Sequence, residues 1–207
     1  MQILIETFGL GLVGGIIPGS ILTILLVSVM RGGFKSGLRS FLWCLAAELT
    51  VVGILLLVIF TLPIPKEIFN FIGLVGSLVL FYFAWQIFNL KQIDRPEETG
   101  AVFSGKQIYL LAATNAPLYI FWVTVCAPLI WQLAESWPLA RATISFMLIF
   151  EIGWTLSTFI IMLLFVKGRN FITNPKVMKK VYAGASFLMF LLGIRMLHLS
   201  LSSLGVI

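Results

Sequence analysis

Six long runs of apolar residues, separated by charged or helix-breaking residues, constrain this chain more than any other feature. They extend approximately over residues 3–30, 38–62, 68–90, 107–132, 139–166 and 177–201. A helix that crosses the hydrocarbon core of a bilayer needs about 20 mostly apolar residues, and none of the runs alternates as the strands of a membrane barrel do. The sequence therefore predicts an all-α polytopic membrane protein with six transmembrane helices.

The composition agrees with a lipid environment. Of the 207 residues, 60% are hydrophobic and only 11% are charged, whereas soluble domains carry about 25% charged residues. Lys and Arg exceed Asp and Glu by 14 to 8, but they lie between the apolar runs and form no basic, aromatic-interleaved face. We therefore expect the lipid bilayer as a partner and no nucleic acid. Cys44 and Cys126 lie inside apolar runs, so neither a secreted disulfide framework nor a zinc site is expected, and no cofactor motif is present.

The basic residues are distributed unevenly among the loops. Eleven lie in the first, third and fifth loops, two lie in the second and fourth, and Arg195 lies inside the last run. Because loops rich in Lys and Arg stay in the cytoplasm, we expect both termini on the opposite side of the membrane.

The two halves of the chain have the same organisation. Residues 1–95 and 105–207 each contain three apolar runs, and an odd number of spans inverts the second copy relative to the first. Inverted repeats of this kind are typical of secondary transporters, whose substrate sites lie near the midplane at broken helices. The chain is therefore expected to form a single transmembrane domain, residues 1–207, built from two inverted three-helix repeats.

Helix-breaking residues and carboxylates recur at matching positions in these repeats. The first run holds Pro18-Gly19-Ser20 and the fourth holds Asn115-Ala116-Pro117, while Glu48 and Glu151 lie in the second and fifth runs. At about 1.5 Å per residue, both prolines and both glutamates lie about 15–20 Å from a span end, near the bilayer centre. A packing kink and a hydrogen-bonded structural glutamate are the alternative interpretations. The recurrence favours a solute pathway, with the glutamates as proton carriers or cation ligands.

Two further features of the apolar runs concern helix packing and charge. Gly11 and Gly15 have the GxxxG spacing, which mostly indicates close packing of helices. Arg195 lies in the outer half of the last run. Its side chain could pair with a glutamate, bind the carboxylate of a substrate or extend to the membrane interface.

The sequence resembles the lysine exporter (LysE/RhtB) family of bacterial amino-acid exporters over nearly the whole chain. That family typically shows Pro-Gly-Pro, an Arg-Gly loop with a further glycine, an acidic residue in the second span and Asn-Pro-Lys in the fourth. The matching positions read Pro18-Gly19-Ser20, Arg31-Gly32-Gly33 with Gly37, Glu48 and Asn115-Ala116-Pro117. Ser20 replaces the second proline, and no lysine follows Pro117. The resemblance implies export of amino acids or related metabolites across a bacterial inner membrane, by proton antiport.

Two other functions are open at this point. Glu48 and Glu151 could hold a hard divalent cation in a metal exporter. Cys44 and Cys126 could serve a membrane thiol–disulfide oxidoreductase, although they do not occupy equivalent positions in the two repeats. The chain is otherwise expected not to be an enzyme, with a small-molecule substrate and protons as partners; a homodimer is compatible with so small a transporter.

Overall fold

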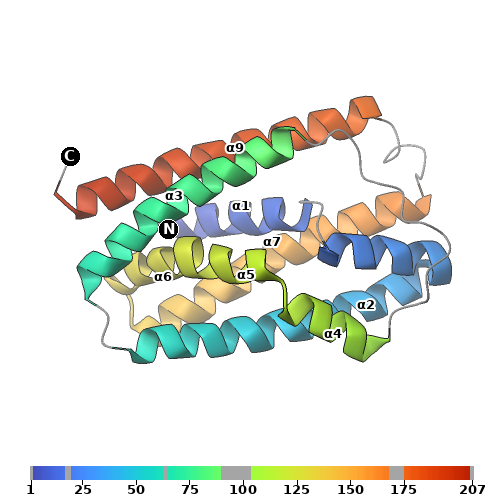
Figure 1. Cartoon of the computed structure of the whole chain (residues 1–207), viewed down its shortest axis with the longest axis horizontal. Coiled ribbons are helices and arrows are strands. Elements are labelled where there is room, and N and C mark those ends of the chain that lie inside the picture. Colours follow the sequence, from blue (N-terminus) through green and yellow to red (C-terminus); the bar gives the residue numbers. More distant parts are fainter. Residues whose placement is uncertain (1, 17–19, 63–64, 90–103, 168–174, 206–207) are drawn as a thin grey trace.

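The computed structural model describes residues 2–16, 20–62, 65–89, 104–167 and 175–205, and every regular element in these ranges is helical (Figure 1). The helices are α1 (Gln2–Ile16), α2 (Ser20–Thr61), α3 (Lys66–Phe88), α4 (Gly105–Ala113), α5 (Ala116–Phe121), the π-helix η1 (Trp122–Cys126), α6 (Ala127–Ala134), α7 (Leu139–Lys167) and α9 (Pro175–Ser203). They lie lengthwise along the molecule, and α1 begins and α9 ends toward the same end of the bundle.

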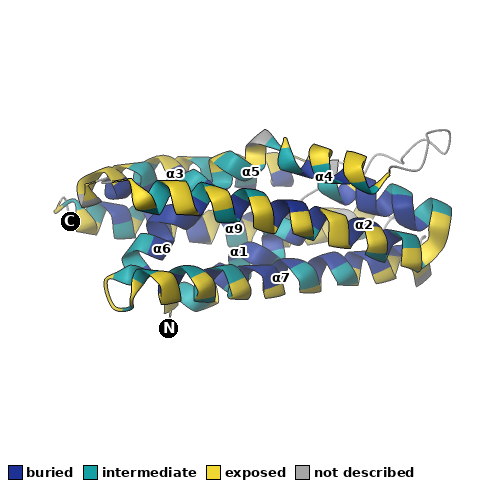
Figure 2. Ribbon diagram, turned by 90° about the horizontal axis from the view of Figure 1, so that it is seen from below, coloured by how far each residue is buried: buried dark blue, intermediate teal, exposed yellow. Residues whose placement is uncertain are grey.

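Five helical segments are long and apolar enough to cross a membrane. They are Ile21–Thr61, Glu67–Phe88, Pro117–Ala134, Leu139–Val166 and Lys179–Ser203, and the shorter α1 is also apolar. Figure 2 shows exposed positions along the outward sides of the helices, and many of these are large apolar side chains such as Leu57, Leu78 and Phe187. An apolar outer surface of this extent suits lipid rather than water. The chain is a multi-pass membrane protein.

The helix α2 reverses direction at Gly33. Its backbone there has φ 68° and ψ −171°, a conformation that glycine adopts without the steric cost of a side chain. Figure 1 shows the part before Gly33 running onward from the end of α1 and the part after it returning alongside. The predicted first run, residues 3–30, is therefore divided between α1 and the beginning of α2.

The predicted fourth run is also divided, and here the break itself is described. The helix α4 is followed by Thr114 and by Asn115, whose φ of −72° and ψ of 95° are extended. Pro117 lies in the first turn of α5, where its missing N–H costs no hydrogen bond. Tyr119 donates its hydroxyl proton to the carbonyl of Ala113 across the break, which satisfies one backbone group that the interruption releases. The break predicted at this position is present.

Helices from opposite halves of the chain form the most extensive contacts: α3 with α9, α1 with α7, and α2 with α4. Glycines allow α1 and α7 to approach closely. A Cβ atom at Gly11 would overlap the backbone of Phe150, and one at Gly15 would overlap the hydroxyl groups of Ser157 and Thr158. The interpretation of Gly11 and Gly15 as packing residues is confirmed.

Candidate functional site

A cavity of about 400 Å³ opens beside both interruptions in the helices. Its described wall comes from both halves of the chain: Gly14, Gly15, Ile21, Leu22, Leu25, Glu48, Phe83, Gln86, Asn115, Pro117, Leu118, Phe121, Trp122, Phe150, Trp154, Thr158 and Met189. Gly14 and Gly15 precede the gap between α1 and α2, and Ile21 follows it. Asn115 and Pro117 flank the break between α4 and α5. Small-molecule sites typically have volumes of about 300–1,000 Å³, so this cavity has a suitable size.

Glu48 is the carboxylic acid among the described residues of this wall. It projects from the returning part of α2 and is only 3% exposed. The indole of Trp122 lies near enough to act on this carboxyl group, yet neither Glu48 Oε2 nor Trp122 Nε1 forms a well-aligned hydrogen bond. Thr158 Oγ1, also on the wall, is buried without a partner as well. Because buried polar groups are normally hydrogen-bonded, three such atoms around one cavity indicate a ligand site.

Glu151 lies near Glu48 but is not among the described residues that line the cavity. It projects from α7, is 9% exposed, and neither of its carboxylate oxygens has a described partner. The two carboxyl groups are close enough to interact electrostatically, and Cys126 of η1 lies within range of both. Since negative charges repel strongly where water is excluded, a shared proton or a bound cation would stabilise this pair.

The other residues predicted for the site have separate outcomes. Asn115 and Pro117 line the cavity. Ser20 and Ala116 begin α2 and α5, although the structure does not describe their side chains, and Pro18-Gly19 lie outside the described residues.

Sequence reasoning missed most of the aromatic residues that line the cavity. Phe150, Trp154 and Thr158 recur at intervals of four on α7 and therefore share one face of that helix. That spacing was a signal, but it is also the pattern of ordinary core packing. Phe83, Phe121 and Trp122 had no signal that distinguished them from the many other aromatic residues of the chain.

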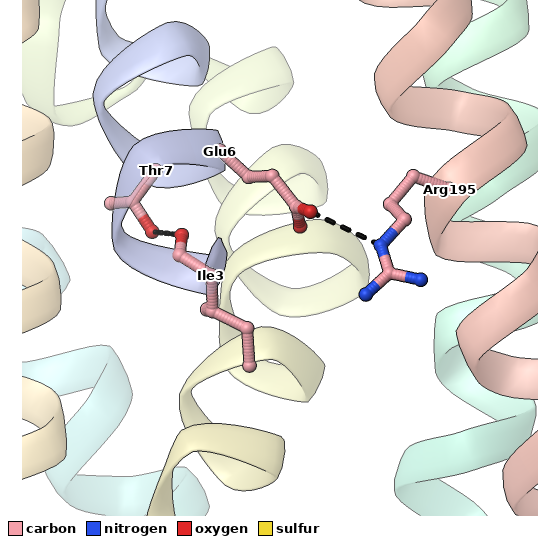
Figure 3. A network of polar contacts seen from close by, with 4 residues as sticks. All are labelled: Ile3, Glu6, Thr7 and Arg195. Atoms are coloured by element: carbon pink, nitrogen blue, oxygen red, sulfur yellow. Dashed lines mark hydrogen bonds and ion pairs between the residues drawn. The ribbon is translucent and has the colours of Figure 1, made fainter. Parts of the chain in front are cut away.

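Arg195 is not among the described residues that line the cavity. Its Nε donates to Oε1 of Glu6 at 3.1 Å, which joins α9 to the beginning of α1 (Figure 3). The side chains of Arg195 and Glu6 are 33% and 13% exposed. Of the three roles left open for Arg195, pairing with a glutamate is therefore the one observed. The partner is Glu6, which the sequence did not indicate, rather than Glu48 or Glu151.

Breaking this ion pair is expected to have a small effect on stability. Glu6→Gln and Arg195→Gln should each lower the free energy of unfolding by about 1 kcal/mol, because the pair is partly exposed to water or headgroups. In a double-mutant cycle measured in detergent micelles, the coupling between the two changes should be about 0.5–1 kcal/mol. Strictly additive effects would show that the pair contributes nothing to the fold.

The described residues give little support to a bound metal ion or to thiol–disulfide exchange. Cys44 and Cys126 are both buried and free of disulfides. No three His, Cys, Asp or Glu side chains among the described positions lie together as they would around a metal ion. Glu48 and Glu151 are therefore two neighbouring carboxylates without a described third ligand of these types.

Comparison of the chain with protein-family models, with curated proteins and with solved structures found no match.

Proposed function

We propose that this multi-pass membrane protein is a secondary transporter that exports amino acids or related small metabolites from the cytoplasm by proton antiport. The observation that carries the proposal is the cavity at the two helix interruptions, with the buried Glu48 carboxyl group on its wall. Buried carboxylates inside membrane domains typically lie on substrate or proton pathways. The resemblance to the lysine exporter family supports the same function.

We further propose six membrane crossings arranged as two inverted repeats, residues 1–95 and 105–207. In this arrangement α1 is the first half of the broken first crossing, and α4 is the first half of the broken fourth. If each helix is replaced by its counterpart in the other half, the contact of α1 with α7 becomes the contact of α4 with α2. The contact of α3 with α9 is unchanged, because these two helices are counterparts of each other. Exchanging the two halves therefore exchanges the main helix contacts, as an inverted repeat requires.

The proposed orientation places both termini outside the cytoplasm of a bacterial cell, in its inner membrane. It rests on the excess of Lys and Arg in the first, third and fifth loops. The beginning of α1 and the end of α9 lie toward the same end of the bundle (Figure 1), as an even number of crossings demands.

In the proposed mechanism, Glu48 binds either a proton or the amino group of the substrate. Both ligands compete for the same carboxylate, so substrate leaving the site toward the outside can be replaced by a proton entering from there. Backbone groups released at the break around Asn115 can bind the remaining polar part of the solute. Glu151 lies within electrostatic range and can take up the proton that Glu48 releases.

A divalent metal cation is the second candidate substrate. The proximity of the carboxylates of Glu48 and Glu151 favours it, because hard cations prefer oxygen ligands. It is the weaker proposal, since Glu151 does not line the cavity and the largely apolar wall gives a hydrated ion few ligands. No observation favours a thiol–disulfide oxidoreductase over either transporter.

The proposal can be tested by measuring the release of solutes from bacterial cells with and without this protein. Cells are preloaded with a dipeptide mixture and with a mixture of primary amines, and the medium is sampled over time. We expect faster release of one or a few amino acids or amines from the cells that carry the protein. Equal release across the whole panel would contradict the proposal, and tolerance to Mg²⁺, Mn²⁺ and Ca²⁺ would be measured next.

A further inference from the structure

The charge balance of the cavity wall limits what the cavity can bind. Among the described residues that line it, the Glu48 carboxyl group is the one ionisable side chain, and none is basic. Residues 17–19, which connect α1 to α2, are Ile-Pro-Gly and add no charge. Arg195 is bonded to Glu6 and lies outside the wall. A solute that carries a positive charge therefore finds a partner here, whereas a carboxylate finds no described cation.

The described wall also carries several aromatic side chains. It includes Phe83, Phe121, Trp122, Phe150 and Trp154. The ring of Phe150 lies 5.0 Å from that of Trp122 and 5.9 Å from that of Phe121, centroid to centroid, so these side chains form one continuous cluster. Aromatic faces attract ammonium groups and also pack against apolar surfaces. The cluster therefore suits a ligand that combines a cationic group with an apolar body.

The size of the cavity excludes a tight fit for very small cations. Its volume of about 400 Å³ exceeds what a bare metal ion or methylamine would fill. An aromatic ring on a short aliphatic chain would occupy the space and cover the apolar wall, while its terminal ammonium reaches Glu48.

We propose that this cavity binds organic ammonium ions with an aromatic-sized apolar body, and that the carboxylate of an amino acid weakens binding there. The proposal rests on the export function inferred above and names its substrate class. An α-carboxylate is attached to the same carbon as the ammonium group. It would lie close to Glu48, with Glu151 nearby and no described basic group on the wall to offset the repulsion.

A matched set of ligands separates these contributions. Phenethylamine, phenylalanine and 3-phenylpropionate share the aromatic body and differ in charge, while methylamine keeps the ammonium and lacks the body. Their binding to the purified protein in detergent micelles is measured by the fluorescence of its tryptophans, two of which line the cavity. Phenethylamine is expected to bind at least about tenfold more tightly than phenylalanine or methylamine. The anion 3-phenylpropionate should not bind.

Two variants then test whether the preference for phenethylamine depends on the carboxylate of Glu48. Glu48→Gln should reduce the affinity for phenethylamine at least about tenfold, whereas Glu67→Gln, which changes an exposed glutamate in the first turn of α3, should leave it unchanged. The ligand series on the unaltered protein remains decisive if Glu48→Gln does not fold.

Three results would overturn the proposal: phenylalanine binding as tightly as phenethylamine, measurable binding of 3-phenylpropionate, or no binding of phenethylamine. The release assay in cells is independent of these measurements. Release of amino acids by a protein that binds no amine would refute the ligand class and leave export in place. The expected ligand preference without release of any solute would support the ligand class and refute export.

Discussion

Release of the exported solute is expected to fall to the background of cells without the protein when Glu48 is replaced by Gln. The glutamine side chain has nearly the same shape but can neither carry a proton nor form an ion pair with an ammonium group. A charged hydrogen bond contributes about 1.5–3 kcal/mol, which corresponds to about a ten- to hundredfold loss of affinity. Loss of proton exchange removes the driving force as well, so the combined effect on release should be the largest of any single substitution.

The same substitution should not destabilise the fold. Glu48 is buried, and its Oε2 has no described hydrogen-bond partner, so a neutral amide at this position removes a desolvation cost. The melting temperature of the purified Glu48→Gln protein is expected to equal or exceed that of the unaltered protein, and Glu67→Gln provides the matched control. Undiminished release by Glu48→Gln would refute its role as proton carrier. Loss of release together with a strongly lowered melting temperature would indicate a structural role.

A large loss of stability is expected from Gly11→Ala. A methyl group at Gly11 would overlap the carbonyl group of Phe150, and backbone atoms cannot move aside as the end of a flexible side chain can. Forcing extra volume into a packed interface typically costs about 1–3 kcal/mol and occasionally more. Because the neighbour is backbone, we expect a value of about 3 kcal/mol, with α1 and α7 pushed apart.

Gly53→Ala and Gly184→Ala are suitable controls for this substitution. Both glycines lie within helices, and an added Cβ atom would meet no atom within 4 Å at either position. Alanine is favoured over glycine inside a helix by about 1 kcal/mol, so these two changes should leave the protein unaffected or make it slightly more stable. The measurement is thermal or denaturant-induced unfolding in detergent. A Gly11→Ala protein as stable as the two controls would contradict the packing of α1 against α7.

Much of the helical architecture could be predicted because lipid imposes simple requirements on sequence. Most of each apolar run lies on described helices, and the reversal at Gly33 falls in the predicted Arg31-Gly32-Gly33 loop. The break at Asn115 follows from the local chemistry of Pro117. The π-helix η1 was not predicted. Pro128, two residues beyond it, has no N–H to donate to the carbonyl of Thr124, so the helix leaves the regular hydrogen-bond pattern just before this proline.

The candidate site was less predictable because it depends on contacts between distant parts of the chain. Glu48 could be proposed from its depth in the membrane, as an isolated carboxylate in apolar surroundings is unusual. The partner of Arg195 could not, because Glu6 is 189 positions away and lies near the start of the sequence. The selection of a few aromatic residues for the cavity wall likewise depends on how α3, η1 and α7 meet.

The pairing of helices across the two halves affects the order in which the protein can be completed during synthesis. The helix α1 leaves the ribosome before α7, and the α7 surface against which its glycines pack is made more than a hundred residues later. The same delay applies to α3, which packs against the later helix α9. At about 5–20 residues per second, the first half waits several seconds with its interfaces uncovered. Quality-control proteases should therefore recognise this protein most readily while the nascent chain still ends before α7.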